Sequence, residues 1–379
     1  MKPIGVLLAW GVVAALVPAL HATAPVPLTY NAITDEAARP EPPLPKMGPA
    51  GTIIVDPTFG SRLLLVSAHP PEAPKAAAFI LGADISWVQQ KEEEGTSYSD
   101  AGGRKDILDI LKDHKFNWIR LRIFHDPKAP KGYSARGYCD LEHTLAMARR
   151  IKAAGLEFLL DFHYSDTWAD PGHQPKPEAW KDLHGADLEK AVREYTREVL
   201  GKMKAQGTAP GMVQIGNEVS NGMLWPDGGI GKSFDVFCGL LKAGIAGARE
   251  ADPSVKIMVH LAWGGQNAQS RWFLDRVIAQ GVEFDLIGQS YYPRWHGTLD
   301  DLKANLTDLA QRYKQPIVLV EYSTPNVRQI NDIVRNLPNG KGLGTFIWEP
   351  TSGPLFDAKG AAKAEIEAYP EMAKDYDGR

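Results

Sequence analysis

Eight short apolar runs alternate with helix-like stretches along most of the chain, and this alternation restricts the possible fold more than any other feature. The runs are Phe79–Ser86, Asn117–Phe124, Glu157–Ser165, Met212–Glu218, Lys256–Trp263, Asp285–Pro293, Pro316–Ser323 and Gly344–Pro350. The stretches between them carry apolar residues three or four positions apart, as in Leu141–Gly155, Leu188–Gly207 and about Leu302–Tyr313. A last helical stretch, Ala361–Tyr376, must break or kink at Pro370. Eight strand–helix units predict an α/β fold with a single (β/α)8 barrel, or TIM barrel.

The end of each run carries polar or aromatic residues. These are Asp84 and Ser86, Arg120 and Arg122, Asp161 and His163, Asn217 and Glu218, His260, Ser290 and Tyr292, Glu321, and Trp348 and Glu349. In a parallel barrel the carboxyl ends of all strands meet at one mouth, where the chemistry of such folds takes place. We therefore expect these side chains to gather in one site.

Two glutamates at strand ends suit the cleavage of a glycosidic bond. Glu218 ends the fourth run and Glu321 the seventh, so both are expected to point into the mouth from opposite sides. A glycosidase needs one carboxylic acid that protonates the leaving oxygen and a second carboxylate that attacks the sugar or activates water. In an enzyme that retains the anomeric configuration, the two carboxyl groups lie about 5–5.5 Å apart. The alternative is that each glutamate is a buried, ion-paired structural residue.

Neighbouring residues distinguish the two roles. Asn217 can donate to the sugar hydroxyl next to the reacting carbon, which makes Glu218 the expected acid/base. A nucleophile must stay ionised, and Arg120 or Arg122, together with the Tyr292 hydroxyl, can keep Glu321 in that state.

Tryptophans are concentrated at the same strand ends. Six of the ten lie at or just after a run: Trp87, Trp168, Trp225, Trp263, Trp295 and Trp348. An indole face covers the apolar face of a sugar ring, so these residues favour a carbohydrate ligand without selecting a particular sugar. Trp118, Trp180 and Trp272 fall elsewhere and are expected to pack inside the fold.

Several longer motifs resemble glycoside hydrolase family 53, the endo-β-1,4-galactanases. They are Gly82-Ala-Asp-Ile-Ser-Trp87, Ile119-Arg-Leu-Arg122, Asp161-Phe-His-Tyr-Ser-Asp-Thr-Trp-Ala-Asp-Pro171, Ile215-Gly-Asn-Glu218, Gly222-Met-Leu-Trp-Pro226, Ser290-Tyr-Tyr-Pro293, Val320-Glu321 and Trp348-Glu-Pro350. The resemblance runs in order from about Phe79 to Tyr376. It implies a retaining hydrolase of β-1,4-galactan, with Glu218 as acid/base and Glu321 as nucleophile.

The resemblance also implies that Trp168 and Trp348 form part of a sugar platform, with Asp84, His163 and His260 nearby. The complete expected substrate-binding set is Asp84, Arg120, Arg122, His163, Trp168, Asn217, His260, Tyr292 and Trp348. Some relatives bind calcium in a long loop after the eighth strand, but that loop is short here, so no metal or other cofactor is expected. Two other readings stay open: another retaining barrel glycosidase, such as a mannanase or an exo-acting galactosidase, and a carbohydrate-binding barrel without catalysis.

Other function classes find little support. The net charge of −4 argues against nucleic-acid binding, which needs a clustered basic face. Gly228–Ser233 resembles a phosphate-binding loop, but Pro226 stands where the motif needs its first glycine, so no nucleotide is expected. The first run also lacks the paired histidines typical of barrel metallohydrolases. Cys139 and Cys238 are equally compatible with a disulfide and with free thiols.

The first 75 residues differ in character from the rest. Residues 1–24 have a lysine, an apolar run and a small-residue pattern, Ala22-Thr-Ala24, as in a signal peptide. An uncleaved signal anchor is the alternative. Residues 25–75 form a Pro-rich extension, which leaves 76–379 as the catalytic domain. We expect an exported protein, periplasmic or secreted, that is monomeric.

Overall fold

Eight parallel strands form a closed barrel in the computed structural model, which describes residues 78–323 and 325–377. The strands are β1 (Ile80–Asp84), β4 (Trp118–Ile123), β5 (Glu157–Phe162), β6 (Met212–Ile215), β9 (Lys256–Leu261), β10 (Leu286–Tyr291), β11 (Ile317–Tyr322) and β12 (Gly342–Trp348). Each pairs with its neighbours in chain order, and β12 pairs with β1 to close the ring. The predicted (β/α)8 barrel is confirmed. Seven of the eight predicted runs contain a whole strand, and the eighth overlaps β12, which starts two residues before that run.

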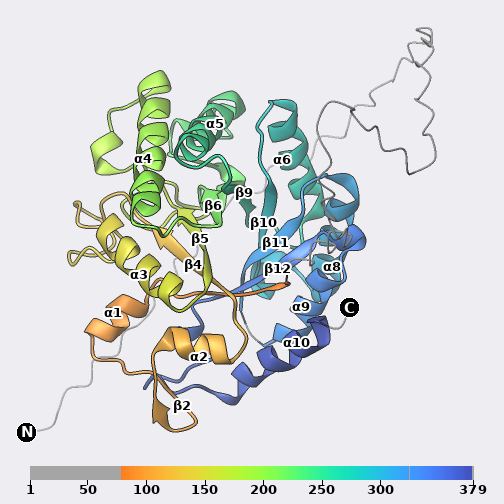
Figure 1. Ribbon diagram of the computed structural model, residues 1–379. Coiled ribbons are helices and arrows are strands. Elements are labelled where there is room, and N and C mark those ends of the chain that lie inside the picture. Colours follow the sequence, from red (N-terminus) through yellow and green to blue (C-terminus); the bar gives the residue numbers. More distant parts are fainter. Residues whose placement is uncertain (1–77, 324, 378–379) are drawn as a thin grey trace, which may run out of the picture. The chain divides into compact units, whose positions relative to one another are not determined.

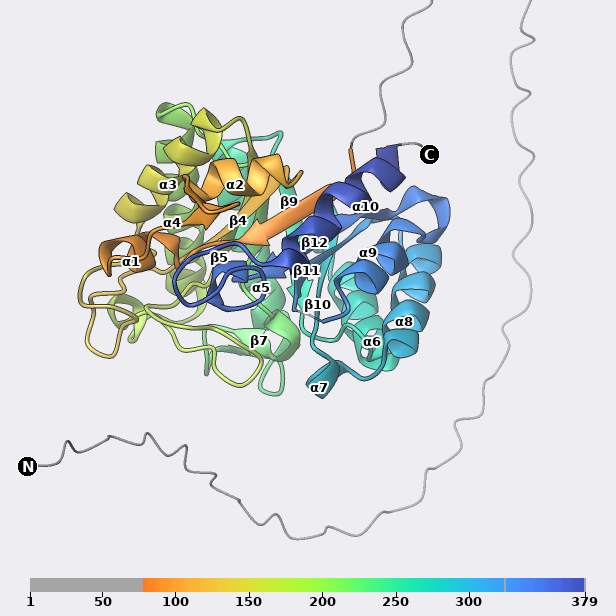
Figure 2. The same cartoon turned by 90° about the horizontal axis from the view of Figure 1, so that it is seen from below.

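Helices surround the barrel on the outside (Figures 1 and 2). The longer ones are α2 (Ile107–Asp113), α3 (Leu141–Ala153), α4 (Gly185–Ala205), α5 (Phe234–Ala251), α6 (Asn267–Ala279), α8 (Leu299–Arg312), α9 (Val327–Arg335) and α10 (Ala368–Asp377). Side chains cap several of them: Asp106, Asp140, Ser233 and Thr298 each accept a backbone N–H of the first turn. The three helices predicted over 141–155, 188–207 and 302–313 are thus present as α3, α4 and α8.

Shorter elements connect these layers. They are α1 (Val88–Glu93), α7 (Pro293–His296), the strand pairs β2 (Ser99–Asp100) with β3 (Gly103–Arg104) and β7 (Gly222–Met223) with β8 (Gly228–Gly229), and 3₁₀ turns at Glu178–Trp180, Val219–Asn221, Pro338–Gly340, Pro350–Ser352 and Ala364–Glu367. The helical stretch is broken as expected, but the break lies between Glu367 and Ala368 and not at Pro370. The α-helix starts at Ala368, so Pro370 lies in the first turn, where no intrahelical N–H bond is lost.

The inward faces of the strands change character along their length. Side chains two positions apart on a strand share a face. Leu159, Met212 and Met258 belong to the apolar cluster that fills the barrel interior, and the residues two positions further on are Asp161, Gln214 and His260. The barrel is therefore packed with hydrocarbon at one level and with buried polar groups nearer the carboxyl ends of the strands.

The predictions for residues 1–24 and 25–75 fall outside the described part of the chain. Within residues 78–323 and 325–377, no helix combines the length and the apolar character needed to cross a membrane.

Candidate active site

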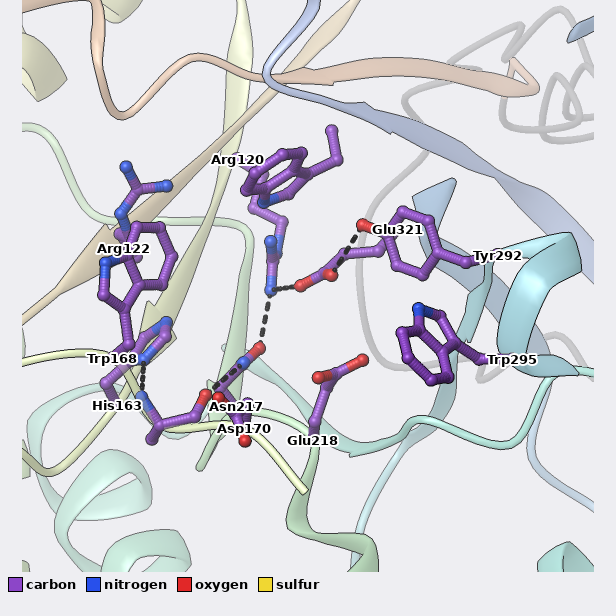
Figure 3. Close-up of a pocket in the computed structure, with 12 residues that line it drawn as sticks. Arg120, Arg122, His163, Trp168, Asp170, Asn217, Glu218, Tyr292, Trp295 and Glu321 are labelled. Atoms are coloured by element: carbon purple, nitrogen blue, oxygen red, sulfur yellow. Dashed lines mark hydrogen bonds and ion pairs between the residues drawn. The ribbon is translucent and has the colours of Figure 1, made fainter. Parts of the chain in front are cut away.

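A cavity of about 260 Å³ lies at the carboxyl ends of the strands (Figure 3). It is lined by Arg120, Arg122, His163, Trp168, Ala169, Asp170, Asn217, Glu218, Tyr292, Trp295, Glu321 and Trp348. Both predicted carboxylates line this cavity, and so do seven of the nine predicted substrate-binding residues, all except Asp84 and His260.

Glu321, on β11, is held by a cation and a hydroxyl. Arg120 Nη2 lies 2.8 Å from Oε1, and the Tyr292 hydroxyl donates to Oε2 at 3.0 Å. Burial raises the pKa of Glu321, while the guanidinium of Arg120 and the Tyr292 hydrogen bond oppose that rise. Both contacts favour the ionised carboxylate.

Glu218 follows β6 in a different environment. Its backbone is left-handed, with φ 45° and ψ 50°, a conformation that costs about 1–3 kcal/mol for a residue with a side chain. Its side chain points into the same space as that of Glu321 (Figure 3). Burial, together with the like charge of Glu321, raises the pKa of Glu218 to about 8. Near neutral pH, Glu218 is thus the carboxyl group that keeps its proton.

Arg120 connects the strand ends beneath the cavity. This side chain is only 1% exposed, and all three guanidinium nitrogens have partners. The partners are Asp84 (2.7 Å), Asp161 (2.9 Å), Asn217 (2.9 Å), Glu321 (2.8 Å) and Gln214 (2.8 Å). A buried charge is tolerated only when it is paired and hydrogen-bonded in this way.

Two residues expected to bind substrate lie beneath the cavity instead. Asp84 and His260 are fully buried, and neither lines the cavity. Asp84 pairs with Arg120, whereas His260 Nδ1 lies 3.2 Å from the backbone N–H of Glu218 and Nε2 lies 2.8 Å from Ser290 Oγ. Burial and the charge of Arg120 hold the pKa of His260 well below its ordinary value. A neutral imidazole accepts the Glu218 N–H and supports the strained backbone at that residue.

Arg122 does not contact Glu321, although the sequence offered it as an alternative to Arg120. Its Nη1 pairs with Glu349 Oε1 at 2.8 Å, and its guanidinium lies 4.3 Å from the ring of Trp168 and 5.3 Å from that of Trp87. Glu349 is fully buried, and burial raises its pKa to about 8 against the opposing charge of Arg122. Arg122 thus lies against a surface of aromatic rings, and it forms no ion pair with Glu218 or Glu321 among the described residues.

That aromatic surface consists of Trp87, Trp168 and Trp348. Their ring centroids are 5.2–6.5 Å apart, in edge-to-face or tilted arrangements. His163 supports the loop that carries Trp168: its Nδ1 accepts the Ala169 N–H at 3.0 Å, and its Nε2 lies 3.1 Å from Asp161.

Sequence reasoning missed two members of the site. Gln214 donates to Asp161 and accepts from Arg120, and its position two residues after the inward Met212 could have revealed it. Asp170 lines the cavity and lies in a motif that was already noticed. Trp295, one of the six tryptophans expected at strand ends, also lines the cavity, from α7.

Three further tryptophans differ in how deeply they are buried. Trp263 packs against the hydrophobic core, and Trp180 is buried as expected. Trp272 is 42% exposed, so the expectation that it packs inside the fold is wrong. The described residues contain no group of three or more His, Cys, Asp or Glu side chains arranged to hold a metal ion, and Cys139 and Cys238 are both buried free thiols.

A family model described as Glycosyl hydrolase family 53 matches residues 80–332. The chain belongs to this family. The resemblance noted in the motifs is confirmed, and the protein is a glycoside hydrolase of the galactanase family.

Relatives of this family 53 hydrolase match about three quarters of the chain. The chain is 45% identical over 316 residues to an uncharacterized protein in the bgaB 5′ region of Niallia circulans, covering 73% of this chain and 84% of that one. It is 39% identical over 318 residues to a probable arabinogalactan endo-beta-1,4-galactanase A of Aspergillus terreus, covering 74% and 88%. Among solved structures, the GH53 catalytic domain of Ignisphaera aggregans aligns with a TM-score of 0.71 at 35% identity, over 77% of this chain and 95% of that one.

The raised pKa of Glu218 predicts a stability cost in this family 53 hydrolase. In the unfolded chain a glutamate loses its proton near pH 4.3, whereas the folded protein keeps it up to about pH 8. Stability therefore falls as the pH rises between these values. At pH 9 the neutral variant Glu218→Gln should be more stable than the wild type by about 1 kcal/mol or more, whereas at pH 4 the two should be alike.

The measurement is the unfolding midpoint at both pH values. Glu283→Gln, which removes an exposed carboxylate, is the control and should follow the wild type throughout. Equal stability of Glu218→Gln and wild type at pH 9 would contradict the assigned environment of Glu218.

Proposed function

We propose that this family 53 hydrolase is a retaining endo-β-1,4-galactanase, which cleaves internal β-1,4-galactosidic bonds in the (arabino)galactan side chains of pectin. The observation that carries the proposal is the unequal environment of two carboxyl groups in one cavity. Glu321 is paired with Arg120 and Tyr292, whereas Glu218 has a raised pKa and no cation at comparable distance among the described ion pairs. Relatives named arabinogalactan endo-beta-1,4-galactanases support the choice of substrate.

In the first step, a Glu321 carboxylate oxygen attacks the anomeric carbon, and the bond from that carbon to the leaving oxygen breaks. Glu218 transfers its proton to the leaving oxygen, so the departing chain leaves as a neutral alcohol. The product is a glycosyl ester on Glu321. Arg120 and the Tyr292 hydroxyl keep Glu321 ionised beforehand and help it to leave afterwards.

In the second step, water attacks the same carbon and the ester bond to Glu321 breaks. Glu218, now ionised, takes a proton from that water and returns to its starting state. Two inversions at one carbon restore the original configuration, which makes the reaction retaining.

The remaining cavity residues bind the sugar in this proposal. Asn217 donates to the hydroxyl beside the reacting carbon, Trp168 and Trp348 stack against ring faces, and His163 lines the cavity with its ring edge-on to Trp168. The face of galactose opposite its axial hydroxyl is apolar, which suits an indole. Asp84 and His260 do not contact the sugar in this proposal. Asp84 forms an ion pair with Arg120, and His260 accepts the backbone N–H of Glu218.

The substrate is tested directly with polysaccharides. The protein should release galacto-oligosaccharides of several lengths early in the digestion of galactan, with no comparable release from arabinan, cellulose or mannan. Exclusive release of a single short sugar would indicate exo action, and preference for mannan would indicate a mannanase. Binding to galactan without any turnover would instead favour a non-catalytic barrel.

The two carboxyl roles are separable with azide as an external nucleophile. Glu218→Ala should lose about 10²–10⁴ in rate on galactan. With nitrophenyl β-galactobioside, whose leaving group needs no proton, its glycosyl-enzyme still forms, and azide should release it as the β-glycosyl azide. Glu321→Ala cannot form that ester, so azide should displace the nitrophenol directly and give the α-glycosyl azide.

The exposed Glu283→Ala is the control for this pair and should keep wild-type activity. If the anomers of the azide products are exchanged between the two variants, the roles are reversed. If either variant keeps near-full activity on galactan, the corresponding assignment is wrong.

We also propose that residues 1–24 direct export and that residues 25–75 link the mature amino terminus to the catalytic barrel. A galactan substrate is too large to enter a cell, which agrees with an exported enzyme. In cells that carry the full chain, the active protein should appear in the periplasm or the medium, with an amino terminus close to residue 25. Recovery of the chain in the membrane fraction with Met1 or Lys2 still present would favour the signal-anchor alternative.

A further inference from the structure

Trp295 is the most exposed large apolar side chain among the described residues, at 65%, and it lines the cavity that contains both carboxyl groups. It lies apart from the aromatic surface of Trp87, Trp168 and Trp348 and comes from α7, directly after β10. The mechanism above does not use it. A ligand that covered this indole would gain the free energy of burying its apolar surface.

The backbone beneath Trp295 is firmly held. Gln266 Nε2 donates to the carbonyl oxygen of Trp295 at 2.7 Å, and the backbone N–H of Trp295 donates to the carbonyl oxygen of Tyr292 at 2.9 Å. A Cβ atom on Gly265 would lie 1.8 Å from the carbonyl oxygen of His296, so this close approach of the two loops requires glycine. Arg294 lies 4.9 Å from the centroid of the indole. Because the backbone is already fixed, only the freedom of the side chain is lost when Trp295 binds a ligand.

The orientation of a bound sugar follows from Asn217. The hydrogen bonds of the described residues use one of its two amide hydrogens, on Ala169 O at 2.8 Å, and the other is available to the hydroxyl beside the reacting carbon. The leaving oxygen is on the neighbouring ring carbon, and the equatorial bond to it points outward from the retained sugar toward the departing part of the chain. In Figure 3, Trp168 lies beyond Asn217 on one side, whereas Trp295 lies on the other side with Glu218 and Tyr292.

From this placement we infer that Trp295 is the binding platform for the leaving half of the polysaccharide, where it stacks on the galactosyl units that depart when the bond breaks. This inference rests on the proposed retaining mechanism. The chain then runs from the surface of Trp168 and Trp348, over Glu321, past the proton on Glu218, and onto Trp295. Because the leaving oxygen must reach Glu218, a platform on that side also aligns the oxygen with its proton donor.

Substrates with and without a sugar leaving group test this assignment. Trp295→Ala should lower kcat/KM on galactan about tenfold or more, and it should leave kcat/KM on nitrophenyl β-galactobioside within about twofold of wild type. Trp295→Tyr keeps an aromatic face and should recover most of the galactan activity. Wild-type activity on galactan tests the proposed function, whereas the ratio between the two substrates tests the platform.

Transfer to an added acceptor gives a second measurement. When galactobiose replaces water, its hydroxyl oxygen bonds to the anomeric carbon, the ester to Glu321 breaks, and the hydroxyl proton passes to Glu218. The acceptor must occupy the leaving-group side, so Trp295→Ala should lose transfer products relative to hydrolysis.

Trp272→Ala is the matched control, because Trp272 is also exposed on a helix and also lies beside an arginine, Arg276, at 4.7 Å. It should behave as wild type with both substrates. Equal losses of Trp295→Ala on galactan and on the nitrophenyl substrate would overturn the inference, since they would place Trp295 on the other side of the bond. Unchanged rates on both substrates, or unchanged transfer, would overturn it as well.

Discussion

One buried guanidinium determines how the mouth of this barrel is built. Arg120 lies on β4, and its partners come from β1, β5, β6 and β11 or follow directly after them, so a single cation ties together the ends of five of the eight strands. Removal of a charge from water is costly, and several charged and polar partners are needed to offset that cost. The acidic groups that surround Arg120 are therefore a condition of its burial, and one of them is the carboxylate that the proposed mechanism uses as nucleophile.

The same arrangement explains why two glutamates in one cavity differ. Arg120 is close enough to pair with Glu321, and the like charge of Glu321 then disfavours ionisation of Glu218. Both Glu218 and Glu349 have left-handed backbones within three residues of the end of a barrel strand, with φ 45° and 41°. In each case the strain turns a carboxyl group inward where a regular strand would continue past the site, and buried neighbours hold it there.

Much of this was predictable from the sequence, because alternation of runs and polar strand ends reflects the barrel directly. The depth of each polar side chain was not predictable, because it depends on where each strand stops. Asp84 and His260 lie within β1 and β9 and under the cavity, whereas Asn217 lies two residues beyond the end of β6 and lines the cavity. Arg120 and Arg122 lie two positions apart on β4 and share one face of that strand, yet Arg120 pairs with Glu321 and Arg122 with Glu349, which follows β12. Trp272 was expected to be packed but is 42% exposed. The spacing of apolar residues in a helix does not reveal which part of its surface the neighbouring helices cover.

The contacts that hold the backbone of α7 have an evolutionary consequence. The backbone at 295 is held by main-chain contacts, by the Gln266 amide and by the close approach of Gly265, while the side chain at this position packs into no core. Substitutions there change what the surface offers to a polymer without a large penalty for folding. Position 295 is thus a place where the barrel can acquire a new preference for chain length or branching in few mutational steps. The hydrogen-bonded residues around Arg120 need not change, and each of them contacts several others.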